Sequence, residues 1–267
     1  MERIVKKLSV LVPTYNNESI IRECLESVKW ADEILICDSY STDRTLDICR
    51  EYTDCILQHE YINSASQKNW AIPQCSHEWV LVIDTDEQLE PQLEEEIRAF
   101  LVDPPSDVDA CRMPRKNIIL GQWLTAMNLW PDYVTRLFRR DASRYQDKEV
   151  HADIEVRGSV LTFERSFIHH GTPSLSKQIG QLDRYTRYQA DEFVKRGRHF
   201  SWARLLLRPP AAFFYYYFLK RGFTAGFRGL FLSAHASMYS FCTYSKLWEK
   251  ERQVEGQITS RRVVDRG

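Results

Sequence analysis

Short apolar runs alternate with longer, more polar segments through the first hundred residues of this 267-residue chain. The runs are rich in valine, isoleucine and leucine, which is typical of buried β-strands. The predicted strands are residues 8–12, 33–37, 55–58 and 79–83. The predicted helices that follow them are residues 19–28, 45–52, 64–72 and 91–101. This regular alternation predicts an α/β fold with a mostly parallel, doubly wound sheet.

Acidic side chains follow two of these strands directly. Asp38 comes at the end of the second predicted strand, and Asp84 and Asp86 follow the fourth with one residue between them. The carboxyl ends of parallel strands meet at one edge of the sheet, where open α/β folds bind ligands. Two carboxylates so close repel each other unless a cation joins them, so a divalent ion that bridges a diphosphate is the first candidate. The alternative is that Asp84 caps a helix and Asp86 is solvated.

The loop after the first predicted strand, Pro13-Thr14-Tyr15-Asn16, lies at the same edge. Tyr15 could stack there on a nucleobase, or it could pack against the start of the next helix. Asp43 precedes a predicted helix and is expected to cap it. This edge is therefore a candidate nucleotide site.

The last quarter of the chain has a different composition. From Lys195 to Gly267 there are fourteen Lys and Arg against four Asp and Glu, which favours an anionic surface as a partner. The same region is rich in aromatic residues, but no uninterrupted apolar run reaches the roughly 20 residues needed to span a bilayer. We expect a helix or helical hairpin that lies in the membrane interface. Two core helices or a homodimer interface are the alternatives.

Composition sets further bounds on the class of protein. The formal net charge of −1 gives no reason to expect a nucleic-acid partner. The seven cysteines are scattered and form no C-x-x-C pair, which fits a reducing cytosol and argues against a disulfide framework or a zinc site. Residues 1–7 are basic and run straight into a strand, so we expect no secretory signal.

Four sequence blocks, taken in order, resemble glycosyltransferase family 2, whose members have the nucleotide-diphospho-sugar transferase (GT-A) fold. The blocks are residues 9–16 (SVLVPTYN), 36–45 (ICDSYSTDRT), 67–71 (QKNWA) and 83–87 (IDTDE). The second half of the chain is similar to the bacterial subgroup that includes the lipopolysaccharide core β-1,4-glucosyltransferases. The segments that carry this similarity are residues 130–132 (WPD), 136–138 (RLF), 150–151 (VH) and 218–248.

The resemblance implies roles for the side chains at the sheet edge. The residues implied in binding the nucleotide sugar are Pro13, Thr14, Tyr15, Asn16, Asp38, Lys68, Asp84 and Arg136. Asp38 would bind the base and Lys68 would approach the diphosphate. Asp86 would bind Mg²⁺ or Mn²⁺ directly, and Asp84 would contact the ribose or the water shell of the metal.

Several basic side chains and histidines could complete this site. Arg136, with Arg139 or Arg140, could clamp the diphosphate, although a solvated role is expected for at least one of them. His169 and His170 could supply a third metal ligand, or they could be structural histidines.

The catalytic base is where the chain departs from the subgroup. The subgroup pattern is Val-His-Glu, but this chain has Val150-His151-Ala152-Asp153. An inverting displacement needs a base that takes the proton of the acceptor hydroxyl. We rank Asp153 ahead of Glu149 and Asp147, with His151 able to act as the base or to orient one of these carboxylates.

The implied protein is an inverting, metal-dependent hexosyltransferase with UDP-glucose as the expected donor. It would act on a lipid-linked saccharide acceptor as a peripheral protein on the cytoplasmic face of a bacterial inner membrane. We expect a GT-A domain over residues 1–200, with a nucleotide-binding half (1–103) and an acceptor half (104–200), and a helical membrane-associating extension over residues 201–267. A polyprenyl-phosphate glycosyltransferase and a non-catalytic GT-A-like binding protein are the alternatives.

Overall fold

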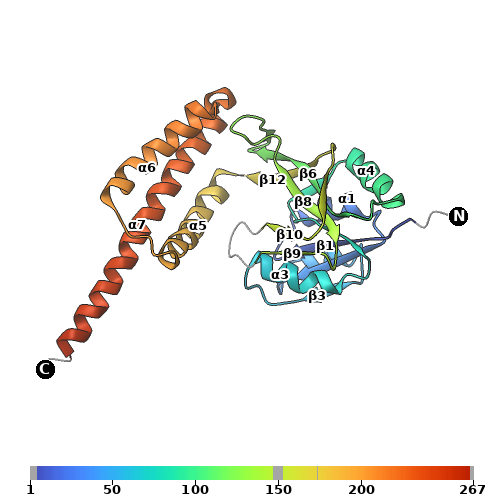
Figure 1. Ribbon diagram of the computed structural model, residues 1–267, viewed down its shortest axis with the longest axis horizontal. Helices are drawn as coiled ribbons and strands as arrows, with labels where there is room; N and C mark the ends of the chain where they lie inside the picture. Colours follow the sequence, from blue (N-terminus) through green and yellow to red (C-terminus); the bar gives the residue numbers. More distant parts are fainter. Residues whose placement is uncertain (1–4, 147–152, 173, 265–267) are drawn as a thin grey trace. The chain divides into compact units, whose positions relative to one another are not determined.

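The computed structural model describes residues 5–146, 153–172 and 174–264, and the chain divides into two units (Figure 1). The α/β unit comprises Met1–Ile118 and Trp130–Gly171. The helical unit comprises Ile119–Leu129 and Thr172–Gly267. Nothing tests the functional division at residues 103 and 200, which stays a prediction.

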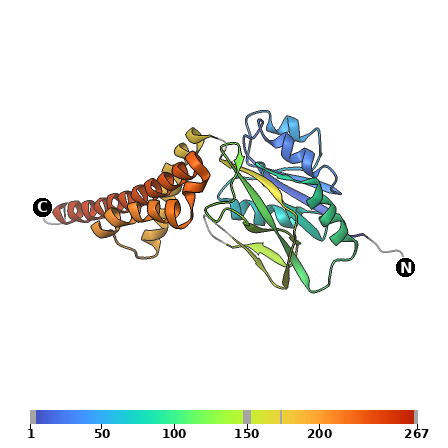
Figure 2. The same ribbon diagram turned by 90° about the horizontal axis from the view of Figure 1, so that it is seen from above.

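One mixed sheet forms the centre of the α/β unit (Figure 2). In spatial order its strands are β3 (Ile56–Gln58), β2 (Glu33–Asp38), β1 (Leu8–Thr14), β4 (Trp79–Val82), β8 (Tyr133–Arg139), β6 (Val108–Ile119), β12 (Phe167–Thr172) and β5 (Glu87–Leu89). The first four strands are parallel, as the sequence predicts, and β8 is antiparallel to both β4 and β6. The remaining strands are β7 (Gln122–Trp123), β11 (Ser159–Thr162), and the ribbon of β9 (Ser143–Tyr145) and β10 (Ile154–Val156).

Alternate residues of β1 belong to two separate apolar cores, because successive side chains of a strand point to opposite faces. Val10 is fully buried in one core, and Leu11 is fully buried in the other. The first core includes buried residues of α1 (Ile21–Val28) and α4 (Pro91–Val102), whereas the second includes those of α3 (Ser64–Ala71). Helices therefore cover both faces, and the predicted doubly wound arrangement is confirmed for this half of the sheet. The helices not yet bounded are α2 (Thr45–Cys49) and the short η1 (Ile72–Gln74).

The helical unit is built on one long helix. Its elements are α5 (Leu175–Lys195), α6 (Trp202–Phe214), the π-helical turn η2 (Tyr215–Leu219), the 3-10 turn η3 (Gly222–Ala225) and α7 (Gly226–Val264). Helix α7 packs against both α5 and α6, so the predicted helical hairpin is present (Figure 1). Among the described residues, no helix is both long enough and apolar enough to cross a membrane.

Candidate active site

The loops after β1 and β2 hold each other at the predicted edge of the sheet. The Asp38 carboxylate is fully buried and accepts hydrogen bonds from the backbone N–H of Ser41 at 3.0 Å and from Gln58 Nε2 at 2.9 Å. Asn16 Oδ1 accepts from the N–H of Thr42 at 2.8 Å. The side chains of Asp38 and Asn16 therefore fix these two loops against each other.

Two predicted nucleotide-binding residues at the end of β1 lie in different environments. Thr14 is buried, and its hydroxyl has no hydrogen-bond partner among the described residues. The Tyr15 side chain is 55% exposed at the end of the strand, so its ring is open to stacking. The carbonyl of Thr14 accepts a hydrogen bond from the N–H of Ser39 at 2.9 Å, which ties the ends of β1 and β2 together.

Asp84 follows β4 and lies between two basic side chains. Its Oδ1 is 2.8 Å from Lys68 Nζ, and its Oδ2 is 2.8 Å from a terminal nitrogen of Arg136. The same guanidinium nitrogen is 2.5 Å from Glu87 Oε1. Lys68 comes from α3 and Arg136 from β8, so three elements meet at this carboxylate. Lys68 and Arg136 therefore both contact Asp84, and their roles toward a diphosphate stay predictions.

Burial and ion pairing work against each other in this cluster. Burial raises the pKa of Asp84, but Lys68 and Arg136 outweigh it and hold that pKa well below its usual range. Burial lowers the pKa of Lys68, but Asp84 more than compensates and raises it. Burial also raises the pKa of Glu87 above its usual value, because Arg136 compensates only in part. Asp84 is therefore ionised near neutral pH, and Lys68 is protonated.

Asp86 faces His169 across a short gap. Its Oδ2 lies 3.9 Å from His169 Nε2, and its carbonyl accepts a hydrogen bond from the N–H of His170 at 2.8 Å. Burial and the nearby guanidinium groups of Arg115 and Arg136 lower the pKa of His169 to about 4, so the ring is neutral near pH 7.

The neighbours of His169 decide which ring nitrogen carries the proton. Asn117 Nδ2 donates to Asp132 Oδ2 at 2.9 Å, so the Asn117 oxygen is the atom 2.8 Å from His169 Nδ1. That contact is a hydrogen bond only if Nδ1 carries the proton, which leaves a lone pair on Nε2. A neutral nitrogen acceptor then faces the oxygen of Asp86, and the two atoms are placed to share a cation.

Gly171 lets the imidazole of His169 take this position. A Cβ atom on Gly171 would lie 2.4 Å from Cε1 of the His169 ring, closer than such atoms approach. Asp86 and His169 are thus a pair with the chemistry to hold Mg²⁺ or Mn²⁺. No group of three or more His, Cys, Asp and Glu side chains with metal-site geometry occurs in the part of the chain that the structure describes.

Other predicted site residues lie elsewhere or outside the description. Arg139 pairs with Glu78, and Arg140 lies 3.0 Å from Asp141. Both arginines lie near the amino end of β4, whereas Asp84 follows its carboxyl end. Asp153 is exposed, and its carbonyl accepts a hydrogen bond from the N–H of Gln146 at 2.9 Å. The base candidates Asp147, Glu149 and His151 lie outside the described residues.

Three polar residues of this cluster were not among the predicted site residues. Glu87 is buried, with only 1% of its surface exposed, and its carboxylate pairs with Arg136. Asn117 and Asp132 orient His169. Glu87 could have been suspected as the third acid of the run Asp84-Thr85-Asp86-Glu87. Asn117 carries no comparable local signal, because its partners come from distant parts of the chain.

Comparison with known proteins identifies the family of the chain. The model of the family described as glycosyl transferase family 2 matches residues 9–161, more than half of the chain. The chain belongs to glycosyl transferase family 2. Its enzymatic class is therefore that of the glycosyltransferases, as the sequence predicts.

Relatives of this family 2 glycosyltransferase match it over almost its full length. It is 28% identical over 250 residues to the lipopolysaccharide core biosynthesis glycosyltransferase LpsC of Rhizobium meliloti, covering 91% of this chain and 92% of that protein. It is 25% identical to an uncharacterized glycosyltransferase of Rickettsia bellii, covering 94% and 90%. The predicted resemblance to lipopolysaccharide core glycosyltransferases is confirmed.

The fold also agrees with a solved structure. The mannosyltransferase PcManGT from Pyrobaculum calidifontis, solved with GDP-Man and Mn²⁺, superposes with a TM-score of 0.53 at 16% identity. The match covers 91% of this chain and 87% of that one. The predicted GT-A fold is confirmed.

Proposed function

We propose that this family 2 glycosyltransferase is an inverting, metal-dependent hexosyltransferase that uses a UDP-sugar, with UDP-glucose as the expected donor. Its acceptor would be a membrane-associated saccharide in the synthesis of lipopolysaccharide or another envelope polysaccharide. The similarity to LpsC, a lipopolysaccharide core biosynthesis glycosyltransferase, supports this setting.

The proposal rests on one observation, the position of Asp86 opposite His169. A carboxylate oxygen and a neutral imidazole nitrogen 3.9 Å apart are suited to share a divalent cation. When bound, Mg²⁺ or Mn²⁺ would stabilise the charge of the departing nucleoside diphosphate. Asp84, fixed by Lys68 and Arg136, would accept hydrogen bonds from the ribose or from a water molecule on the metal.

The nucleotide would bind along the edge formed by the ends of β1 and β2. Tyr15 would stack on the base, and the buried Asp38 would hold the loop that contacts it. The proton of the acceptor hydroxyl would go to a carboxylate of the segment 147–153, with Asp153 as the first candidate. Asp153 is an exposed residue at the start of β10, where an acceptor could reach it.

The metal-dependent step can be tested by UDP release. The wild-type protein with UDP-glucose and Mn²⁺ should release UDP slowly by hydrolysis even without an acceptor. Asp86→Asn should lower this rate by about 100-fold or more, because the change removes a charged ligand and weakens stabilisation of the leaving group. Equal rates in the variant and the wild type would contradict the assigned role of Asp86.

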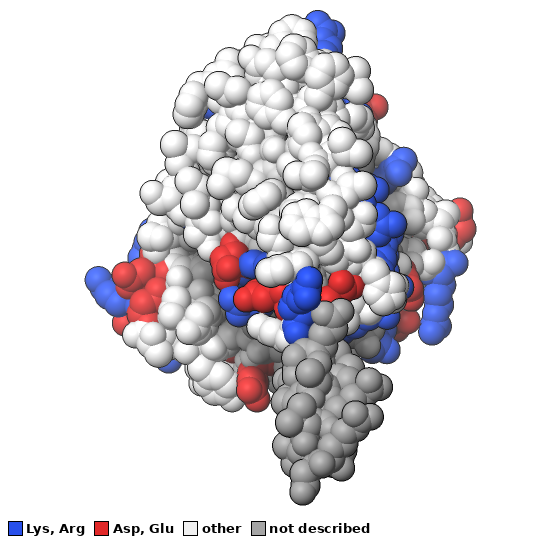
Figure 3. Space-filling view, turned by 90° about the vertical axis from the view of Figure 1, so that its left-hand side faces the viewer, with Lys and Arg blue, Asp and Glu red and all other residues white. Residues whose placement is uncertain are grey.

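A membrane surface is the second partner that we propose. No Asp or Glu occurs between Phe193 and Trp248, whereas that segment contains nine Lys and Arg. Figure 3 shows a broad surface without charged residues on one face of the molecule. Large apolar side chains of α6 to η3 are exposed, among them Leu206 at 66%, Leu207 at 67% and Leu219 at 64%. Exposed apolar and aromatic side chains, in a segment whose only charged side chains are Lys and Arg, suit the interface of an anionic bilayer.

A further inference from the structure

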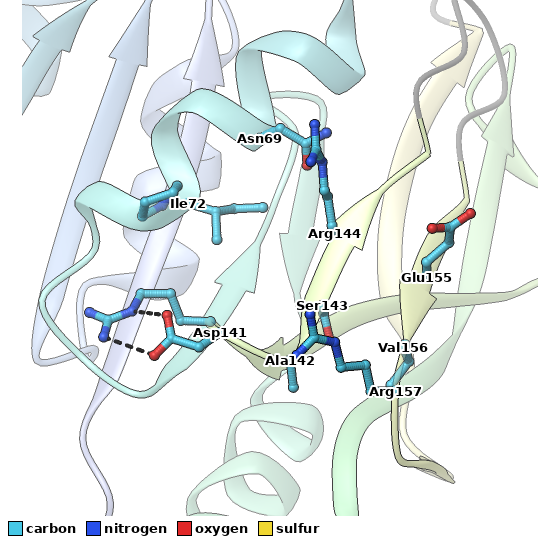
Figure 4. Close-up of a pocket in the computed structure, with 11 residues that line it drawn as sticks. Asn69, Ile72, Asp141, Ala142, Ser143, Arg144, Glu155, Val156 and Arg157 are labelled. Atoms are coloured by element: carbon cyan, nitrogen blue, oxygen red, sulfur yellow. Dashed lines mark hydrogen bonds and ion pairs between the residues drawn. The ribbon is translucent and has the colours of Figure 1, made fainter.

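A cavity of about 670 Å³ lies between η1 and the β9–β10 ribbon of the α/β unit (Figure 4). Its volume lies within the roughly 300–1,000 Å³ typical of small-molecule sites. Ile72 and Pro73 of η1 and Val156 of β10 give it an apolar lining. Small side chains of Ala142 and Ser143 leave the space open on the ribbon side.

Hydrogen bonds between its walls preform this cavity. The Asn69 side chain donates to the carbonyl of Tyr145 and accepts from its N–H, both at 2.9 Å. Arg140 donates to the carbonyl of Cys75 at 2.8 Å and pairs with Asp141. The first contacts tie the ribbon to α3, and the second ties the chain before the ribbon to the turn after η1.

Two further arginines that line the cavity have no such partners. Figure 4 shows Arg144 reaching toward Asn69, and Arg157 reaching toward Ala142 and Ser143. The structure gives neither guanidinium group an ion pair or a hydrogen bond with a described residue. Since Arg140 is already paired with Asp141, Arg144 and Arg157 are the cations available to a ligand.

The other lining groups indicate what such a ligand carries besides negative charge. The Glu155 carboxylate, on the strand opposite Arg144, can accept hydrogen bonds from hydroxyl groups. The apolar lining suits the C–H faces of a sugar ring. Guanidinium groups bind carboxylates and phosphates through paired hydrogen bonds. Together these groups fit a saccharide with acidic substituents better than a bare inorganic anion.

We propose that this cavity binds a sugar unit that carries a carboxylate or phosphate group and belongs to the acceptor. The inference rests on the proposed glycosyl transfer and specifies its acceptor as anionic. One wall of the cavity supports it, because its elements also reach the proposed site. Helix α3, which supplies Asn69 to the cavity, also supplies Lys68 to Asp84. Lys68 Nζ lies 5.3 Å from the ring centre of Tyr145, the residue of β9 that Asn69 binds.

Binding of defined saccharides to the full-length protein tests this proposal. Trigalacturonate and glucose 6-phosphate would be titrated by calorimetry in the presence of saturating UDP and Mn²⁺, with maltotriose and inorganic phosphate for comparison. At least one anionic sugar should bind saturably, and at least about tenfold more tightly than maltotriose and inorganic phosphate. Arg144→Gln and Arg157→Gln should each weaken that binding by about tenfold.

Two control variants and a test of folding make the result decisive. Arg50→Gln, an exposed arginine of the same unit, should bind the sugars as the wild type does, and circular dichroism should show that all variants are folded. Asp86→Ala should retain sugar binding while losing UDP release, which separates a failure of the cavity from a failure of the proposed function. Absence of saturable binding, equal weakening in Arg50→Gln, or equally tight binding of inorganic phosphate would overturn the proposal.

Discussion

At the scale of single residues, one guanidinium group joins two acids of the site, the partly exposed Asp84 and the buried Glu87. Arg136 contacts both Asp84 and Glu87, and Lys68 contacts Asp84 from the other side. Glu87 also accepts a hydrogen bond from the N–H of Asp84 at 3.0 Å. Glu87 therefore helps to orient Asp84 toward a ligand. Glu87 is itself buried and cannot contact that ligand.

Glu87→Gln should destabilise the protein although it keeps the shape of the side chain. The variant leaves the buried Arg136 with one carboxylate instead of two, and unbalanced buried charge is costly. We expect the free energy of unfolding to fall by about 3 kcal/mol, measured by urea denaturation. Glu95→Gln, on the exposed face of α4, should change it by less than about 0.5 kcal/mol. Equal stability of both variants would mean that the cluster does not depend on the charge of Glu87.

The local sequence predicts the positions of some residues of this cluster but not of others. Asp38, Asp84 and Asp86 could be placed because each follows an apolar strand, and parallel strands end at a common edge. Lys68 could be placed only through the family resemblance. Asn117 was not singled out because its partners, Asp132 before β8 and His169 in β12, are distant from it in the sequence. The roles of all these residues in catalysis stay predictions.

At the scale of elements, the helical hairpin depends on a close backbone contact. A Cβ atom on Gly229, near the start of α7, would lie 1.8 Å from the carbonyl oxygen of Gly222. Ser233 lies one turn further along α7, and its buried hydroxyl donates to the carbonyl of Gly229 at 2.7 Å. The glycine pair therefore allows α7 to pack against the turn that precedes it.

Gly229→Ala should disrupt this turn. The methyl group would meet backbone atoms that cannot rotate away. We therefore expect the free energy of unfolding to fall by at least about 2 kcal/mol, measured by denaturation monitored with far-UV circular dichroism. Gly180→Ala is the matched control, because nothing lies within 4 Å of its Cβ position in α5. It should stabilise the protein by up to about 1 kcal/mol. A Gly229→Ala protein as stable as the control would refute the close contact.

The sequence predicts helices and strands well where a single hydrophobic periodicity dominates the segment. The predicted strands and helices of the first hundred residues lie within a few residues of those in the structure, but β5 was not among them. The antiparallel strands from β6 onward have no such simple pattern, since residues of β6 alternate between burial and exposure irregularly. Its pairing with β8 contains a register shift that no local pattern reveals.

At the scale of the whole molecule, charge and apolar surface are distributed unequally along the chain. The formal net charge is −1, yet the segment from Phe193 to Trp248 has nine basic and no acidic residues. Such a segment, with exposed leucines and aromatic residues, would give the proposed enzyme a means of reaching a membrane-associated acceptor.

Vesicle sedimentation tests this surface. The wild-type protein should bind vesicles that contain anionic phospholipid more tightly than neutral vesicles, and salt should weaken the binding. The double change Leu206→Glu and Leu207→Glu should weaken it by roughly 100-fold, because two leucine side chains leave the apolar interface. Ile62→Glu, which alters a 71% exposed apolar residue of the α/β unit, should leave it unchanged.

Two outcomes would contradict the membrane assignment. One is retention of wild-type vesicle binding by the leucine double variant. The other is a wild-type dimer that dissociates in that variant by size-exclusion chromatography without a change in vesicle binding, which would assign the surface to a second copy of the chain.

The central claim is that the aspartates after β4 form a metal-assisted site for a UDP-sugar. A thermal shift screen of nucleotide sugars, with and without Mn²⁺, tests it most directly, because a ligand that binds the native state raises its stability by about 2.7 kcal/mol at 100 times its Kd. UDP-glucose should raise the melting temperature most, and only with Mn²⁺ present. A melting temperature that no nucleotide sugar changes, or that rises equally without a divalent cation, would contradict the account.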